Sequence, residues 1–137
     1  IKCLKCEKVC PNHGLKYRHI DELPEAYLIK AKDTQLLRNT ASGSICTLLA
    51  EYFINKKHGF VCGAVYDKEL NVVHIVTDDL SDVWAMRQSK YVQSNLGGCF
   101  VDIENKLKQG KYVLFIGTGC QVYALKKFLN KRYTTLY

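Results

Sequence analysis

The apolar run at residues 112–116 (YVLFI) constrains the fold more than any other stretch of this chain. A short strand without polar alternation is typical of a sheet that is covered on both faces. Gly117 and Gly119 follow it, and apolar residues at helical spacing begin after Cys120, so a strand leads directly into a helix. This order predicts an α/β (mixed α+β) fold with a central mixed sheet flanked by helices.

Three further strands are expected. Residues 60–66 and 72–77 are rich in β-branched and aromatic side chains and are separated by the stretch DKELN, which predicts a hairpin. Residues 26–30 are expected to form a short strand around Tyr27. His74 lies within the second strand of the hairpin, and we expect it to be half-buried and hydrogen-bonded to a neighbour.

A helix is predicted over residues 42–57, because apolar residues recur there at i, i+3, i+4, i+7 and i+8. Its buried face is expected to consist of Ile45, Leu48, Leu49, Tyr52 and Phe53. The hydroxyl of Ser42 is expected to cap the first turn. Gly59 is expected to end the helix in the left-handed conformation.

Two more helices and one long loop complete the expected architecture. Residues 78–87 begin with acidic side chains, which suit a helix N-terminus. Residues 100–108 carry an apolar stripe and the pair Glu104 and Lys108, and Gly110 is expected to cap that helix. Residues 88–98 are polar without a clear period, and we interpret them as a functional loop.

The charge balance favours anionic ligands or partners. The chain carries 20 Lys and Arg against 13 Asp and Glu, a formal excess of +7. The basic residues are spread along the chain, so no nucleic-acid partner is expected.

No apolar run reaches the roughly 20 residues of a membrane span, and no leader pattern opens the chain, which predicts a cytoplasmic protein. The sequence allows either a monomer or an oligomer.

Three cysteines near the start of the chain form the pattern C-x2-C-x3-C-P. Cys3, Cys6 and Cys10 match the bacterial ferredoxin run C-x2-C-x2-C-x3-C-P from its second cysteine onward. The first cysteine of that run would fall one residue before Ile1, so we expect the motif to begin upstream. The total of seven cysteines is odd and three crowd one end, which argues against a secreted disulfide framework.

Two metal groups fit this pattern. Three thiolates at this spacing suit a [4Fe–4S] cluster, and the following proline belongs to the ferredoxin pattern. Zinc would take the same cysteines together with His13, and the chain would then be a zinc-stabilised binding module that docks an acidic partner. We interpret residues 1–20 as a partial ferredoxin-like segment and residues 21–137 as the α/β domain.

The junction GTGCQ at residues 117–121 is the second informative stretch. Free amides at the start of a helix after a buried strand favour an anion at the carboxyl end of the sheet. Cys120 lies at this helix N-terminus, where the backbone dipole stabilises a thiolate. The stretch is not a dinucleotide fingerprint, because Val122 stands at the third glycine position. The other three cysteines are expected to be core or incidental: Cys46, Cys62 and Cys99.

The cysteine run, SGSICTLLAEY, QSKYVQSNL and FIGTGCQVYALKKFL together resemble the successive motifs of the coenzyme F-420 hydrogenase/dehydrogenase beta-subunit family. The resemblance covers nearly the whole chain and corresponds to the N-terminal part of longer proteins, so we expect the α/β domain to continue further. It implies an iron–sulfur flavoprotein oxidoreductase that passes electrons between a [4Fe–4S] cluster and FAD or FMN. A redox protein partner, or a deazaflavin-type substrate that takes hydride, would complete the reaction.

The resemblance also implies site residues in this sequence. Cofactor or substrate contacts would come from Ser42, Gly43, Lys90, Tyr91, Gln93, Gly117, Thr118 and Gln121. The catalytic residues would be Lys90 and Cys120, with Cys120 acting as a further cluster ligand or as a thiol beside the flavin. The family pattern is broken by Ser44, Cys46, Gln88 and Gly119. Glycine at 119 loosens a turn that the family's proline stiffens.

Overall fold

A computed structural model describes residues 25–137 of the chain. The cysteine cluster Cys3, Cys6 and Cys10, its rival zinc ligand His13 and the predicted segment 1–20 lie outside the described residues. The elements in order are α2 (Thr34–Asn39), a 3-10 turn (Ser42–Ser44), α3 (Ile45–Lys57), β1 (Phe60–Tyr66), β2 (Val72–Thr77), α4 (Leu80–Met86), α5 (Cys99–Lys108), β3 (Val113–Phe115) and α6 (Gly119–Leu129).

The sheet has three strands in the order β2-β1-β3. β1 and β2 form the predicted antiparallel hairpin, with Val61 opposite Thr77 and Tyr66 opposite Val72. β3 runs parallel to β1 and pairs only with its first residues, from Phe60 to Cys62. The expected mixed sheet is therefore confirmed.

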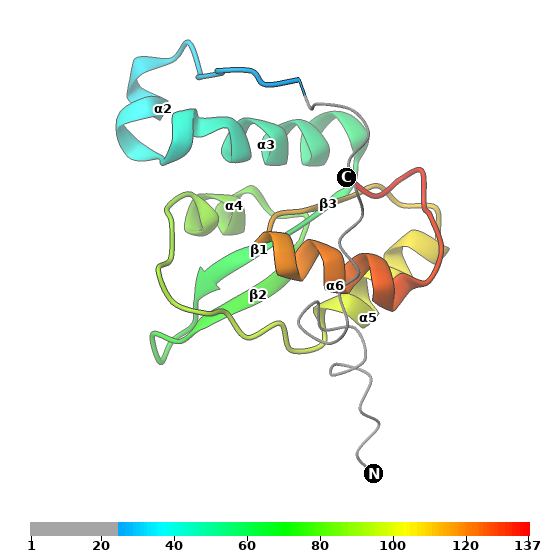
Figure 1. The fold of residues 1–137 in the computed structure, drawn as a ribbon. Coiled ribbons are helices and arrows are strands. Elements are labelled where there is room, and N and C mark those ends of the chain that lie inside the picture. Colours follow the sequence, from blue (N-terminus) through cyan, green and yellow to red (C-terminus); the bar gives the residue numbers. More distant parts are fainter. Residues whose placement is uncertain (1–24) are drawn as a thin grey trace.

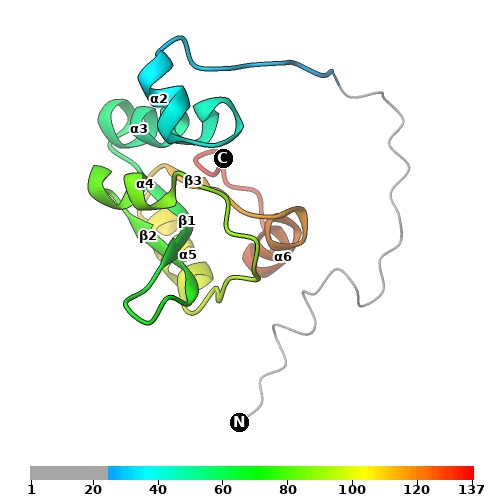
Figure 2. The same cartoon turned by 90° about the vertical axis from the view of Figure 1, so that its left-hand side faces the viewer.

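Helices cover both faces of this sheet, as Figures 1 and 2 show. On one face α5 and α6 pack Ile103 and Leu125 against β1 and β3. On the other face α3 and α4 pack Phe53 and Val83 against the same strands. Neighbouring residues along β1 and β3 alternate between the two clusters, because successive strand side chains point to opposite faces. The α/β fold predicted from the apolar run at residues 112–116 is confirmed.

The outer edge of β3 is covered by the end of the chain. The Val113 amide donates to Thr135 O over 2.8 Å, and the Tyr137 amide donates to Val113 O over 2.9 Å. The Tyr137 ring packs against Phe53 with centroids 5.1 Å apart. β3 is thus paired along both edges, and because helices also cover both faces of the sheet its side chains need no polar alternation.

The predicted strand at residues 26–30 is wrong. This segment is extended but pairs with no strand of the described chain, and Leu28 is fully exposed. Directly after this segment, the Ala31 amide donates to Gly43 O over 2.8 Å and joins the chain to the turn before α3. Residues 26–30 favour a β conformation, but no edge of the described sheet lies beside them to form backbone hydrogen bonds. The short helix α2 that follows, capped by the Asp33 carboxylate, was not predicted.

The predicted apolar face of α3 is also wrong in most positions. Leu48, Leu49 and Tyr52 are exposed, and the buried face consists of Thr47, Ala50 and Phe53. Small residues face the sheet because they let the helix approach it closely.

Both predicted ends of α3 need correction. The Ser42 hydroxyl does not cap α3, because the residue at the N-cap position is Ser44, and the Ser44 hydroxyl accepts no capping hydrogen bond either. At the other end His58, with φ +48°, takes the left-handed conformation that was expected of Gly59. Gly59 is required for a different reason, because a Cβ there would lie 2.7 Å from Tyr112 O.

The later elements agree with the sequence. α5 carries the expected ion pair, with Lys108 Nζ 3.2 Å from Glu104 Oε2, and Gly110 is left-handed with φ +74° just after it. Within residues 25–137 no helix combines the length and the apolar character that a membrane crossing requires.

Candidate functional site

A pocket of about 860 Å³ opens where β3 leaves the sheet. β1 pairs with β3 only as far as Cys62, and the next residues of β1, Gly63 and Ala64, line the pocket instead. The other walls come from the N-terminal turns of α3 and α6 and from the loop between α4 and α5. Figure 2 shows this loop running between α4 and α6.

The pocket brings together most of the residues predicted to contact a cofactor. Those that line it are Ser42, Lys90, Tyr91, Gln93, Gly117, Thr118 and Gln121, together with Cys120. Gly43 does not line it. With φ +69°, Gly43 turns its backbone toward the segment before α2, where a Cβ would lie 2.8 Å from Ile29 O.

The N-terminus of α6 forms one wall. Thr118 occupies the N-cap position, and its amide donates to Gln121 Oε1 over 2.9 Å. The Gln121 Nε2 group donates to Ser94 Oγ over 2.9 Å, so this side chain joins the helix to the 88–98 loop. Gln121 therefore fixes the shape of the pocket in addition to lining it.

The 88–98 loop is anchored at both ends. Lys90 Nζ donates to Ala85 O over 2.8 Å, which holds the loop to the last turn of α4. At its far end Asn95 pairs with the edge of β2, where the His74 amide donates to Asn95 O over 2.9 Å. Between these anchors Tyr91 is 95% exposed, so its ring is open to solvent at the pocket wall. Partial burial lowers the pKa of the Lys90 ammonium.

The turn before α3 forms the opposite wall and has unusual backbone geometry. Ser42, Gly43 and Ser44 are all left-handed, with φ of +51°, +69° and +65°. Left-handed serines are strained, and such strain is concentrated at functional sites. The Ala41 amide donates to Arg87 O over 3.2 Å, which ties this wall to the end of α4.

The pocket is electropositive. Its charged lining residues are Arg87 and Lys90, and no Asp or Glu among the described residues lines it. The N-termini of α3 and α6 both open onto it, and each helix dipole places partial positive charge there. The apolar lining includes Val83, Met86 and Leu96. This arrangement suits an anionic ligand that also carries an apolar or planar part.

His74 closes the inner end of the pocket as a structural residue. Its Nε2 lies 3.2 Å from Ile116 O and its ring stacks on Phe115 at 5.7 Å. Because a carbonyl oxygen only accepts, Nε2 carries the proton, and the buried Nδ1 has no hydrogen-bond partner within residues 25–137. Burial lowers the pKa of His74, so the ring is neutral at pH 7. His74 is more deeply buried than predicted, and its bond to a neighbour is as expected.

The cysteines fall into two groups. Cys46 and Cys120 are exposed and both line the pocket, so the expectation of a core or incidental role for Cys46 is incomplete. The Cys120 thiol lies 3.0 Å from Thr118 Oγ1. Cys62 and Cys99 are buried as expected. The neighbouring Cys99 thiol and burial raise the pKa of Cys62, and Cys99 Sγ donates to His74 O over 2.9 Å.

Sequence reasoning missed Cys46 and Arg87 as pocket residues. Cys46 lies within the motif SGSICTLLAEY, and Arg87 directly precedes the motif QSKYVQSNL, so their positions in or beside the motifs were the available signal. No cluster of three or more His, Cys, Asp or Glu that could hold a metal ion occurs between residues 25 and 137.

In comparisons with known proteins, no protein-family model matches the chain, and no curated protein matches it.

Proposed function

We propose that the chain is the flavin-binding part of an iron–sulfur oxidoreductase similar to the coenzyme F-420 hydrogenase/dehydrogenase beta subunits. One observation carries the proposal: three motif segments that are far apart in the sequence surround one pocket, at residues 41–47, 88–94 and 117–121. If the resemblance of the three motifs were due to chance, we would not expect all three to line the same pocket.

The pocket fits a flavin nucleotide in size and chemistry. Its volume of about 860 Å³ lies within the range of roughly 300–1,000 Å³ that is typical of small-molecule sites. The helix N-termini, Arg87 and Lys90 would bind the phosphate, because free amides and cations stabilise that charge together. Val83, Met86 and Leu96 would contact the ring system and exclude water. FAD is the expected flavin, with FMN as the other candidate.

A flavin in this pocket would supply hydride and single-electron chemistry. The chain's own residues would bind and orient it. Lys90, held by Ala85 O, would attract the phosphate or stabilise negative charge that develops on the ring. Cys120 lies at the N-terminus of α6 on the pocket wall and would contact the ligand as a thiol. A redox protein partner or a deazaflavin-type substrate would exchange electrons with this site, in the cytoplasm.

The thiolates of Cys3, Cys6 and Cys10 would hold the [4Fe–4S] cluster. Three cysteine sulfurs are the donor type that iron–sulfur clusters require. This part of the proposal depends on the sequence pattern, since the cysteines lie outside the described residues.

Protein purified without oxygen tests the proposal directly. We expect flavin absorbance bands, a broad iron–sulfur shoulder and iron in elemental analysis. The Cys6→Ser variant is expected to lose the shoulder while it keeps the flavin. Zinc in place of iron, with no flavin in the preparation and no quenching of added FMN, would refute the proposal.

A second test uses the charge of the phosphate. Lys90→Gln is expected to weaken FMN binding by about tenfold, measured by fluorescence quenching, and to leave riboflavin binding nearly unchanged. Lys68→Gln is the matched control, because Lys68 is an exposed lysine in the β1–β2 turn, away from the pocket lining. Equal effects of the two substitutions would contradict a phosphate contact at Lys90.

A further inference from the structure

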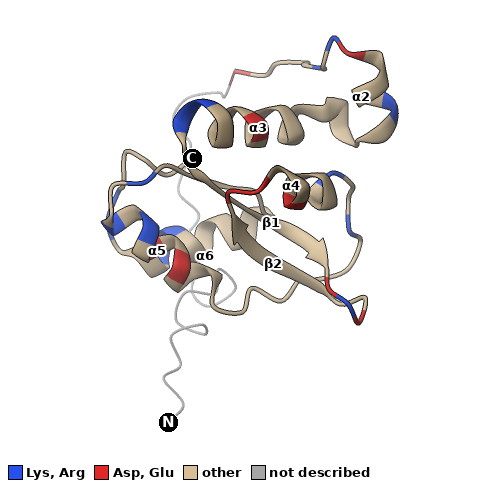
Figure 3. Cartoon of the chain, turned by 180° about the vertical axis from the view of Figure 1, so that it is seen from behind, with Lys and Arg blue, Asp and Glu red and all other residues tan. Residues whose placement is uncertain are grey.

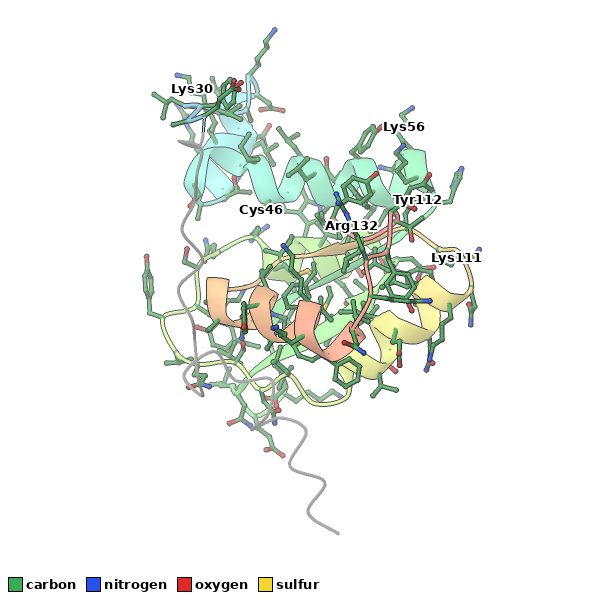
Figure 4. All side chains as sticks on the ribbon, turned by 45° about the vertical axis from the view of Figure 1, so that its right-hand side comes forward. Lys30, Cys46, Lys56, Lys111, Tyr112 and Arg132 are labelled. Carbon is green, nitrogen blue, oxygen red and sulfur yellow. The ribbon has the colours of Figure 1, made fainter. Side chains whose placement is uncertain are left out.

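A basic surface covers the end of the molecule that lies away from the pocket. We define the basic end by Lys56, Lys57, Lys111, Lys131 and Arg132. From residue 105 to residue 137 the chain carries seven basic residues and no acidic one. Figure 3 shows blue segments gathered at the end of α3, on α5 and in the chain after α6, and Figure 4 shows Lys56, Lys111, Tyr112 and Arg132 at this end.

The elements of the basic end are packed together through aromatic rings. Lys57 Nζ lies 5.1 Å from the centroid of the Tyr112 ring, and the Tyr112 and Tyr137 rings are 6.4 Å apart. Lys131 Nζ lies 4.4 Å from the Tyr133 ring. These contacts join the end of α3, the start of β3 and the chain after α6 into one surface.

The basic end and the pocket lie at opposite ends of the same elements. α3 and α6 begin at the pocket, and their last turns carry basic residues near the basic end. β3 begins beside Lys111 and ends at the pocket. An occupant of the basic end therefore leaves the pocket open.

The charges of the basic end are not neutralised within residues 25–137. The ion pair formed in this part of the chain joins Lys108 to Glu104, and none of the five cations of the basic end takes part in one. Lysines in the last turn of α3 are explained by the helix dipole. Lys111, Lys131 and Arg132 lie outside the helices, so the dipole does not account for them.

We propose that the basic end docks an acidic protein surface. Carboxylate groups complement exposed lysine and arginine side chains, and arginine binds a carboxylate with two parallel hydrogen bonds. A single-stranded nucleic acid would also require open aromatic faces for base stacking. At the basic end the ammonium groups of Lys57 and Lys131 already lie over the rings of Tyr112 and Tyr133. This arrangement favours a protein partner and does not depend on what the pocket binds.

Two triple variants with equal loss of charge test the proposal. K111Q/K131Q/R132Q removes the cations outside the helices from the basic end, and K30Q/K32Q/K68Q removes three exposed lysines elsewhere. The probes are fluorescein-labelled poly-L-glutamate and a fluorescein-labelled oligothymidine with the same number of charges. Binding is followed by fluorescence anisotropy at two salt concentrations, and circular dichroism verifies that each variant is folded.

We expect poly-L-glutamate to bind the unmodified chain more tightly than the oligothymidine does. The first triple variant should bind poly-L-glutamate about tenfold more weakly and with a smaller salt dependence, and the second should stay within roughly twofold. Equal losses in the two variants would overturn the proposal, because net charge alone would then explain binding. Tighter binding of the oligothymidine that is lost in the first variant would overturn it in favour of a nucleic-acid partner.

Discussion

Replacing Gly59 with alanine tests how tightly the end of α3 packs on the sheet. The added Cβ would lie 2.7 Å from Tyr112 O and 2.9 Å from Tyr112 Cβ, whereas ordinary contacts of a Cβ begin at 3.4 Å. The Tyr112 carbonyl cannot move freely, because it accepts a 2.8 Å hydrogen bond from the Phe60 amide. Either β3 or the end of α3 must therefore shift by several tenths of an ångström.

Overpacking of this kind costs about 1–3 kcal/mol of unfolding free energy. Urea unfolding followed by circular dichroism should show this loss as a lower midpoint with an unchanged slope. Gly119→Ala is the matched control, because its Cβ would meet nothing within 4 Å and its φ is not positive. That variant should be neutral or more stable by up to about 1 kcal/mol. If Gly59→Ala unfolds within roughly 0.5 kcal/mol of the unmodified chain, the contact with Tyr112 relaxes at no cost and the packing argument fails.

Three further predictions concern the pocket. Because burial holds the pKa of His74 below its ordinary value of 6.5, its contribution to stability is present above about pH 6.5 and is lost as the pH falls toward the lowered pKa. Urea midpoints between about pH 5 and 7.5 should show this slope, and His74→Gln should remove it. Gln121→Ala should cost about 0.5–1.5 kcal/mol and speed hydrogen exchange in residues 88–98, because the bond to the loop is lost; unchanged exchange would contradict the anchoring role. Cys120 should react with a maleimide at least about tenfold faster than Cys62 in peptide-mapped mass spectra, and equal rates would contradict the burial of Cys62.

The later part of the fold could be predicted because its signals are local. The β1–β2 hairpin follows from β-branched runs and the turn between them, and α5 follows from its apolar stripe and the pair Glu104 and Lys108. The strand-to-helix junction follows from one apolar run and two glycines. In each case the residues that define the element also contact one another within it.

The details of α3 could not be predicted because they depend on tertiary partners. Periodicity marks a helix but does not say which side meets the sheet, and here Thr47 and Ala50 are buried while Leu48 and Leu49 remain exposed. Likewise, His58 takes the left-handed conformation, whereas Gly59 is required by its close approach to Tyr112, a tertiary contact that no local pattern encodes. The pocket could not be predicted from the sequence either, because its walls come from three motifs that only the folded chain brings together. Gly43 belongs to one of these motifs and still does not line the pocket.

The early departure of β3 from the sheet sets the size of the cavity. After Phe115 the chain turns away at Gly117, and the vacated edge of β1 presents only Gly63 and Ala64. Extending β3 by two paired residues would fill this space with backbone, and a larger side chain at Gly63 would meet Met86 of the pocket lining, since an added Cβ would lie 2.6 Å from its sulfur. Part of the β1 edge therefore stays unpaired and adds no stability through strand pairing, and the space beside it is an opening that a ligand can enter.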